Sequence, residues 1–386
     1  MSASPTSPSS TLPGRAEQFS TRVCFFVAGF TFAAWAPIVP YVKDRTDLGD
    51  SGLGLLLLCL GGGSVAGMPL AGWLSKKYGC RLPILFAVQL VISALPVLSL
   101  ASSLPLLALA LFVCGVGLGT LDCVMNIQAI IVERASGRAM MSGFHGLFSL
   151  GGLAGAGLMT LLLSSGLAPF SAVMFIVSLT VAAMAMAAPY LLPYGAEGDG
   201  AAFAIPHGVV LLIGLLCFVV FMTEGSVLDW SAVFLTSIRN VDPSLGGLAY
   251  AAFSLTMTIC RLTGDAVVER VGRARMLLAG PLCAAIGLFV VTLVPSSWGT
   301  VIGFGLVGVG CANVVPILFT AIGRQKAMPE HVAVPAVTMI GYLGILAGPA
   351  AIGFIAHAVG LLTAFILIAV LLLAVAAGGR FLRVDD

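Results

Sequence analysis

The sequence predicts an all-α membrane protein with twelve transmembrane helices, arranged as two parallel six-helix repeats. Three observations support this fold class: an apolar composition, long uncharged runs of helical length, and a match of the chain with itself at a fixed offset. Of the 386 residues, 59% are hydrophobic and only 9% are charged. Soluble domains carry about 25% charged residues. This chain therefore has too few charges to cover a water-facing surface, and lipid must face much of it.

The uncharged runs have the length of membrane spans. About 20 helical residues cross the hydrocarbon layer, and a helix satisfies its own backbone hydrogen bonds there. The predicted spans are 22–42, 52–74, 82–101, 104–132, 139–163, 168–188, 208–236, 246–268, 276–294, 297–323, 332–356 and 361–380. The segment before them, residues 1–21, is rich in Ser, Thr and Pro, and we expect a disordered cytoplasmic tail there.

The distribution of positive charge predicts the orientation. Of the 18 Lys and Arg residues, fourteen fall in tails and loops on one side of the spans and only three, Lys43, Arg45 and Arg239, on the other. Cytoplasmic loops are the ones enriched in Lys and Arg. We therefore expect a multi-pass protein of the bacterial cytoplasmic (inner) membrane with both termini in the cytoplasm. The net charge of +2 gives no indication of a nucleic-acid partner.

The chain matches itself at an offset of 193 residues. "SLGGLAG" (149–155) falls on "YLGILAG" (342–348) with five of seven positions identical, and Gly79 falls on Gly272. An offset that spans six helices keeps both copies in the same orientation, which indicates a parallel repeat. The predicted segments are an N-terminal bundle (22–188), a cytoplasmic linker (189–207), a C-terminal bundle (208–380) and a cytoplasmic tail (381–386).

Several stretches resemble the major facilitator superfamily over about residues 22–383. "GWLSKKYGCR" (72–81) is similar to the superfamily's G-x-L-x-D-R-x-G-R-R loop, with Lys76 at the acidic position, and "DAVVERVGRAR" (265–275) is similar to its second copy. "AWAPIVPYVK", "GTLDCVMNIQAIIVER", "MSGFHGLFSLGGLAGAG" and "LDWSAVFL" resemble the YbjJ-type branch, related to fucose permease-like carriers. The resemblance implies two six-helix halves that expose a central site to each side of the membrane in turn.

Ionisable side chains inside a bilayer are costly and usually face a cavity or a partner. Asp122 lies near mid-depth in the fourth span, with Asn126 one turn further on the same face and Asn313 opposite it in the repeat. Glu224 lies within the seventh span. We expect these four residues to bind the solute or a coupling proton. The alternative for Asp122 is a structural hydrogen bond between helices.

Two further polar or aromatic side chains are candidates for the same site, and six charged ones for gates. His145 can titrate near neutral pH, and Trp35 can stack on a sugar ring. A hydrogen-bonded structural His and an interfacial Trp are the alternatives. The residues expected to gate the site, or else to form solvated charged loops, are Asp229, Arg261, Asp265, Glu269, Lys76 and Arg81.

The sequence favours a secondary active transporter over an enzyme. We expect symport of a small polar organic solute, sugar-like or another metabolite, with protons by alternating access, in a monomer within the lipid bilayer. Proton-driven efflux of a drug or metabolite, and a non-transporting membrane sensor, are the alternatives. The nine cysteines lack metal-ligand spacing, so we expect no disulfide, no metal and no cofactor. Solute identity and direction of transport are not encoded in any motif that we identify.

Overall fold

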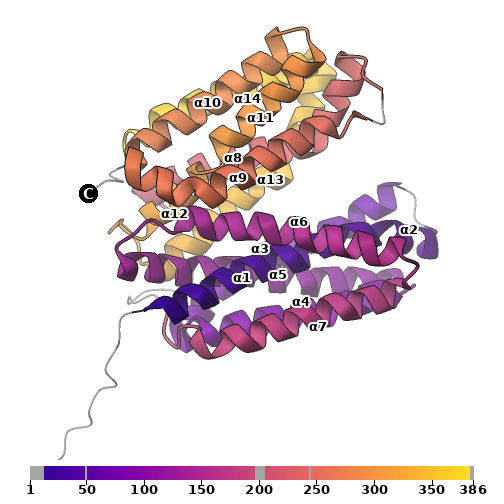
Figure 1. Ribbon diagram of the computed structural model, residues 1–386, viewed down its shortest axis with the longest axis vertical. Coiled ribbons are helices and arrows are strands. Elements are labelled where there is room, and N and C mark those ends of the chain that lie inside the picture. The colour runs from indigo at the N-terminus through magenta and orange to yellow at the C-terminus, as the bar shows by residue number, and fades with distance from the viewer. Residues whose placement is uncertain (1–12, 48–49, 196–204, 243–244, 383–386) are drawn as a thin grey trace, which may run out of the picture.

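A computed structural model describes residues 13–47, 50–195, 205–242 and 245–382. Figure 1 shows two helical bundles, one from each half of the chain, stacked along the long axis. The first bundle holds α1 (Arg15–Ala34), η1 (Ala36–Ile38), α2 (Val39–Thr46), α3 (Asp50–Tyr78), α4 (Arg81–Leu100), α5 (Leu104–Ser136), α6 (Met141–Ser164), α7 (Pro169–Ala187) and η2 (Ala188–Tyr190). The second holds α8 (Gly208–Val233), η3 (Phe234–Ile238), α9 (Leu248–Val271), α10 (Arg273–Leu293), α11 (Ser297–Cys311), α12 (Val314–Ile322), α13 (Glu330–Val359) and α14 (Leu361–Gly379).

The helices have the lengths that a bilayer requires. Within the described residues, 11 helical segments are long and apolar enough to cross a membrane. α3 is a further helix of 29 residues and coincides with the predicted span 52–74. Large apolar side chains remain exposed on helices of both bundles, as expected of surfaces that lie in lipid. The predicted fold class is therefore confirmed.

The first helix begins earlier than the sequence predicted. α1 starts at Arg15, so seven residues assigned to the disordered tail are helical, whereas residues 1–12 lie outside the described part of the chain. The backbone N–H of Gly14 donates to Oε2 of Glu17 at 2.7 Å. This capping contact stabilises the first helical turn, although the Ser- and Pro-rich composition predicts a disordered tail there.

Prolines interrupt the first and tenth predicted spans. Pro37 and Pro40 accompany the 3₁₀ turn η1 that separates α1 from α2. The span predicted at 297–323 is divided into α11 and α12 around Ala312 and Asn313. Pro316 lies four residues after Ala312 and has no N–H with which to bond the Ala312 carbonyl. That carbonyl is free to accept a hydrogen bond from outside the helix.

The internal repeat is visible in equivalent helix–helix contacts of the two bundles. A Cβ added at Gly151 or Gly155 of α6 would lie 2.1 Å from the carbonyl oxygens of Phe26 and Phe30 on α1. The residues 193 positions later, Gly344 and Gly348 of α13, approach α8 in the same way, at 2.3 Å and 2.8 Å from the carbonyl oxygens of Phe218 and Met222. Only glycine allows such close backbone approach. The two glycine-rich stretches therefore do the same packing work in each half.

Two outer arginines repeat a second contact. Arg45 donates to the carbonyl oxygens of Leu98, Ser99 and Ala101, near the end of α4, at 2.8–3.0 Å. Arg239 donates to the carbonyl oxygens of Val291 and Val294, near the end of α10, at 2.7 Å and 2.9 Å. The unpaired carbonyls at a helix C-terminus favour cations. Both arginines are therefore structural caps.

The two bundles meet mainly through two helix pairs, α6 with α9 and α3 with α13. These pairs are equivalent in the repeat. We call the end of the molecule at which α5 ends and α6 begins the inner end, and the opposite end, where α2 lies, the outer end. α1 begins and α14 ends on the same side in Figure 1, as an even number of spans requires.

Candidate functional site

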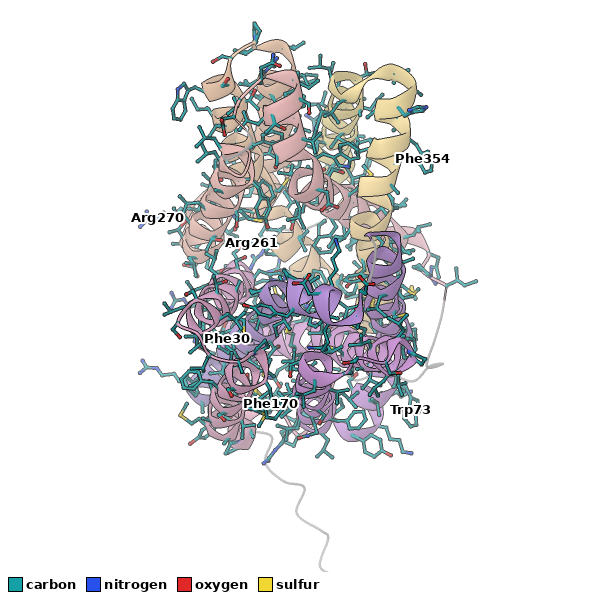
Figure 2. All side chains as sticks on the ribbon, turned by 90° about the vertical axis from the view of Figure 1, so that its right-hand side faces the viewer. Phe30, Trp73, Phe170, Arg261, Arg270 and Phe354 are labelled. Carbon is teal, nitrogen blue, oxygen red and sulfur yellow. The ribbon has the colours of Figure 1, made fainter. Side chains whose placement is uncertain are left out.

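A buried ion pair lies at mid-depth where the bundles meet. Arg261, near the middle of α9, donates from Nη2 to Oε1 of Glu224 on α8 at 3.0 Å. The two side chains are only 8% and 17% exposed. Figure 2 shows Arg261 at the junction of the two bundles, whereas Arg270 of the same helix points outward. Glu224 therefore has the partner that a charge inside a bilayer needs.

Arg261 also forms hydrogen bonds with two other parts of the protein. Its Nη1 donates to Oγ of Ser149 on α6 in the other bundle at 3.1 Å, and its Nε donates to the Ala312 carbonyl at 3.2 Å. This is the carbonyl that Pro316 leaves without a helical partner. The proline break thus creates an acceptor for the guanidinium, and Ser149 makes the ion pair part of the contact between the halves.

A second polar group surrounds Asp122 on α5. Asn126 donates from Nδ2 to the Asp122 carbonyl at 2.9 Å and approaches its Oδ1 at 3.4 Å. On α13, Tyr342 hydrogen-bonds Ser64 and lies within electrostatic range of Asp122. Within the described residues Asp122 forms no ion pair, and it is only partly buried. It is therefore a mid-depth carboxyl group without a fixed cation.

The remaining predicted binding residues occupy three different surroundings. His145 lies between the rings of Phe25 and Phe319, with centroid distances of 5.2 Å and 5.8 Å, and its Nδ1 is 3.0 Å from the Met141 carbonyl oxygen. Asn313, at the start of α12, donates to the Cys260 carbonyl at 3.3 Å.

Trp35 lies in the apolar core of the first bundle and is only 8% exposed. The indole Nε1 of Trp35 and the Oδ1 atoms of Asn126 and Asn313 are buried without a hydrogen-bond partner. These three polar atoms remain available to a ligand or to water.

The three predicted gating residues on α9, Arg261, Asp265 and Glu269, lie at two different depths. Arg261 belongs to the mid-depth group described above, not to the inner end. Asp265 accepts a hydrogen bond from the Gly143 backbone N–H, in the first turn of α6, at 2.9 Å. Glu269 pairs with Arg138 at 3.5 Å, and both are exposed. Asp265 and Glu269 therefore join the halves at the inner end.

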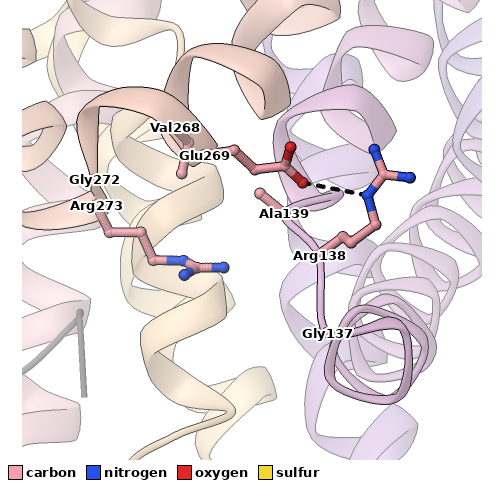
Figure 3. Close-up of a pocket in the computed structure, with 7 residues that line it drawn as sticks. All are labelled: Gly137, Arg138, Ala139, Val268, Glu269, Gly272 and Arg273. Carbon is pink, nitrogen blue, oxygen red and sulfur yellow. Dashed lines mark hydrogen bonds and ion pairs between the residues drawn. The ribbon is translucent and has the colours of Figure 1, made fainter.

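A cavity of about 420 Å³ lies beside the Arg138–Glu269 pair. Figure 3 shows the side chains that line it. The cavity opens between the loop that joins α5 to α6 and the loop that joins α9 to α10. Its remaining lining residues are Gly137, Ala139, Val268, Gly272 and Arg273. The cavity thus lies at the inner end, away from Asp122 and Glu224.

Three other predicted gating residues lie near helix ends. Asp229 is exposed towards the outer end of α8. Lys76 is exposed near the inner end of α3, and the backbone N–H of Arg81 bonds the Leu192 carbonyl at 2.8 Å. The loop between them turns at Gly79, whose φ is +75° and whose added Cβ would lie 2.2 Å from the Pro193 carbonyl oxygen. This loop packs against the segment that follows η2.

Sequence reasoning missed Glu133, which joins the halves at the inner end. Its Oε2 accepts from the backbone N–H groups of Met140 and Met141 at 2.8 Å, and its Oε1 accepts from Oγ1 of Thr320 on α12 at 2.6 Å. Arg273 approaches the same Oε1 at 3.9 Å. In the sequence, Glu133 is the first residue after the predicted span 104–132. A buried carboxylate in that place could have been suspected only with the opposing helix known.

Arg134, its neighbour, pairs with Glu330 of α13 and also donates to the Gly323 carbonyl. All the ion pairs and hydrogen bonds described between the bundles thus lie at mid-depth or at the inner end. Among the described residues, polar contacts therefore join the two bundles at mid-depth and at the inner end.

Comparisons with known proteins agree with this architecture. Residues 23–211 and 210–386 each match the Major Facilitator Superfamily. The chain belongs to the major facilitator superfamily. An uncharacterized MFS-type transporter of Yersinia pestis is 53% identical over 369 residues, which cover 95% of this chain and 96% of that protein. Family membership makes this chain a membrane transporter and not an enzyme, as the sequence predicted.

Two solved structures share the fold at low identity. The fucose:proton symporter FucP of E. coli superposes with a TM-score of 0.79 at 16% identity, covering 94% of this chain and 98% of that one. The human organic anion transporter MFSD10 superposes with a TM-score of 0.73 at 14% identity, covering 94% and 99%. At these identities the likeness shows the major facilitator fold alone.

Proposed function

We propose that this superfamily member is a proton-coupled symporter of a small polar organic solute, sugar-like or another metabolite. The observation that most supports this is Asp122, a mid-depth carboxyl group that has no ion pair among the described residues. A proton is the simplest partner for such a group, and ionisable residues inside a bilayer commonly serve proton relays. That FucP is a fucose:proton symporter on the same fold is consistent with the proposal.

Alternating access follows from the contacts between the bundles. When the inner end opens, the bonds from Glu133 to Thr320 and from Asp265 to Gly143 must break. The Arg261–Ser149 bond at mid-depth would break with them. Asp122 and Glu224, with Asn126, Asn313, His145 and Trp35 as further candidates, would then meet solute and proton from the other side. Asp229, Lys76 and Arg81 are proposed to line the entrances.

The proposed setting is the inner membrane of a bacterium, with a monomer whose termini are both cytoplasmic. The inner end then faces the cytoplasm. The proposed functional units are the bundles 22–188 and 208–380, joined by the linker 189–207. Proton entry supplies about 2.3 kcal/mol for each charge per 100 mV of membrane potential, which is enough to concentrate a neutral solute.

The test compares Asp122→Asn with wild type in proteoliposomes. We expect the variant to lose uptake driven by a proton gradient while it keeps solute counterflow, because exchange needs no net proton movement. Asp44→Asn is the matched control, since Asp44 is an exposed carboxylate at the outer end of α2. Undiminished proton-driven uptake by Asp122→Asn would remove Asp122 from the coupling mechanism.

The fold leaves the charge of the solute open. FucP carries fucose with protons, whereas MFSD10 is an organic anion transporter, and both superpose on this chain. The charge of the solute must therefore be inferred from the residues of this chain.

A further inference from the structure

We propose that the solute is uncharged, and that Glu224 excludes organic anions by occupying the mid-depth cation. This inference rests on the proposed function and sharpens its solute class. A carrier for a carboxylate or phosphate needs a cation free to pair with it. Among the described residues, Arg261 is the one Lys or Arg near the middle of a spanning helix. The question is whether its guanidinium is free.

The guanidinium of Arg261 is already bonded in three directions. Nη2 donates to Glu224, Nη1 to Ser149 and Nε to the Ala312 carbonyl, at 3.0 Å, 3.1 Å and 3.2 Å. The side chain is 8% exposed. An anionic solute would have to displace Glu224 and leave that carboxylate buried without a counter-charge. Breaking a buried pair in this way is strongly unfavourable.

Other described cations near the membrane interior do not provide a substitute. Arg239 and Arg45 cap the outer ends of α10 and α4. Arg22 is exposed near the inner end, with its guanidinium carbon 5.9 Å from the centroid of the Phe144 ring. Asp122 adds a second carboxyl group at mid-depth. An anion there would meet more negative than available positive charge.

The groups that remain available suit hydroxyl groups. The Oδ1 atoms of Asn126 and Asn313 are buried acceptors without a partner. Tyr342 and Asp122 add a phenol and a carboxyl group on facing helices. Neutral hydroxyls can donate to such acceptors without disturbing the Arg261–Glu224 pair. A cationic solute would instead compete with the proton for Asp122, which the proposed coupling does not allow.

Probes matched in shape and different in charge test the inference. Binding to purified wild type is measured by thermal shift for galactose, galacturonate and galactosamine, and for glucose, glucuronate and glucosamine. We expect each neutral sugar that binds to do so at least about tenfold more tightly than its acid or amine. A uronate or an amino sugar that binds as tightly as its neutral partner would overturn the inference.

A variant tests the role given to Glu224. Glu224→Gln leaves the guanidinium of Arg261 without its counter-charge, so galacturonate and glucuronate should bind this variant about tenfold or more tightly than wild type. Glu224→Asp keeps the charge and should keep the exclusion of acids. Equal uronate binding by wild type and Glu224→Gln would show that Glu224 does not set the charge preference.

If no sugar probe binds, the melting temperatures of single and double variants test whether Glu224 and Arg261 neutralise each other. Glu224→Gln and Arg261→Gln should each lower the melting temperature of the detergent-purified protein, and the double variant should recover most of the loss. No recovery in the double variant would overturn the inference, because the two charges would not be compensating each other. Absence of sugar binding with full recovery would instead count against the sugar-like solute of the proposed function.

Discussion

The contacts of α6 with α9 and of α3 with α13 are equivalent in the repeat but differ in chemistry. Across α6 and α9, charged groups bridge the bundles: Arg261 bonds Ser149, and Asp265 bonds the Gly143 backbone N–H. A carboxylate at a helix N-terminus is stabilised by the helix dipole. This contact is therefore held together largely by polar and electrostatic attraction.

Across α3 and α13, close packing replaces charge. The 193-residue offset places Gly72 at the position of Asp265, and an added Cβ there would lie 2.2 Å from the His331 carbonyl oxygen. Lys76 stands where Glu269 stands in the other contact. His331 is fully buried, and neither ring nitrogen has a hydrogen-bond partner. The difference indicates that a repeat can keep its helix arrangement while the described hydrogen bonds across its two equivalent contacts differ.

Breaking the Arg261–Glu224 ion pair should lower the stability of the protein more than any other change considered. Arg261→Met leaves Glu224 buried without its counter-charge, so we expect a loss of about 3–5 kcal/mol in stability. Thermal unfolding in detergent measures it. Arg270→Met is the control, because Arg270 lies on the same helix but is exposed. Equal melting temperatures for the two variants would contradict the bridging role of Arg261.

The second-largest loss of stability is expected when a side chain is added between α3 and α13. Gly72→Ala places a methyl group against the backbone of α13, and overpacking of this kind costs about 1–3 kcal/mol. In the same helix, Gly62→Ala meets nothing within 4 Å and serves as the control. Unfolding of both variants is followed by circular dichroism. A Gly72→Ala protein as stable as Gly62→Ala would mean that α3 and α13 are not closely packed in solution.

Removing the charge at the α6 N-terminus should have a smaller effect. Asp265→Asn keeps an acceptor for the Gly143 N–H but loses the interaction of a full charge with the helix dipole, about 0.3–1 kcal/mol. Hydrogen–deuterium exchange of the first turns of α6 should accelerate, while exchange at the start of α13 should not change. Faster exchange at both helices would argue against independent contacts.

The smallest effect is expected from Glu269→Gln. The Arg138–Glu269 pair spans 3.5 Å between side chains that are 78% and 39% exposed, so solvent screens it. Its loss should change stability by no more than about 0–1 kcal/mol, and added salt should remove the difference. A larger, salt-resistant loss of melting temperature would show that the cavity in Figure 3 is drier than its exposure indicates.

Much of the fold could be predicted from the sequence because the bilayer acts on local properties. Apolar runs of span length, their even number and the 193-residue offset are all visible in a linear chain. The mid-depth position of Asp122, and the position of Glu224 within its span, followed from counting residues along helices. The start of α1 at Arg15 was missed, because a short polar capping contact does not change composition.

The sequence alone determined that this protein is a twelve-helix, two-repeat membrane transporter with a few buried acids, because lipid selects for long apolar helices wherever they lie. Only the tertiary structure decided which charges meet. The sequence predicts Arg261 as a gating residue together with Asp265, but it pairs with Glu224, 37 residues away on another helix. Glu133 looked like a helix end and proved to join the halves. The partner of a buried charge depends on which helices face each other. The spacing of residues along one helix does not determine its neighbouring helices.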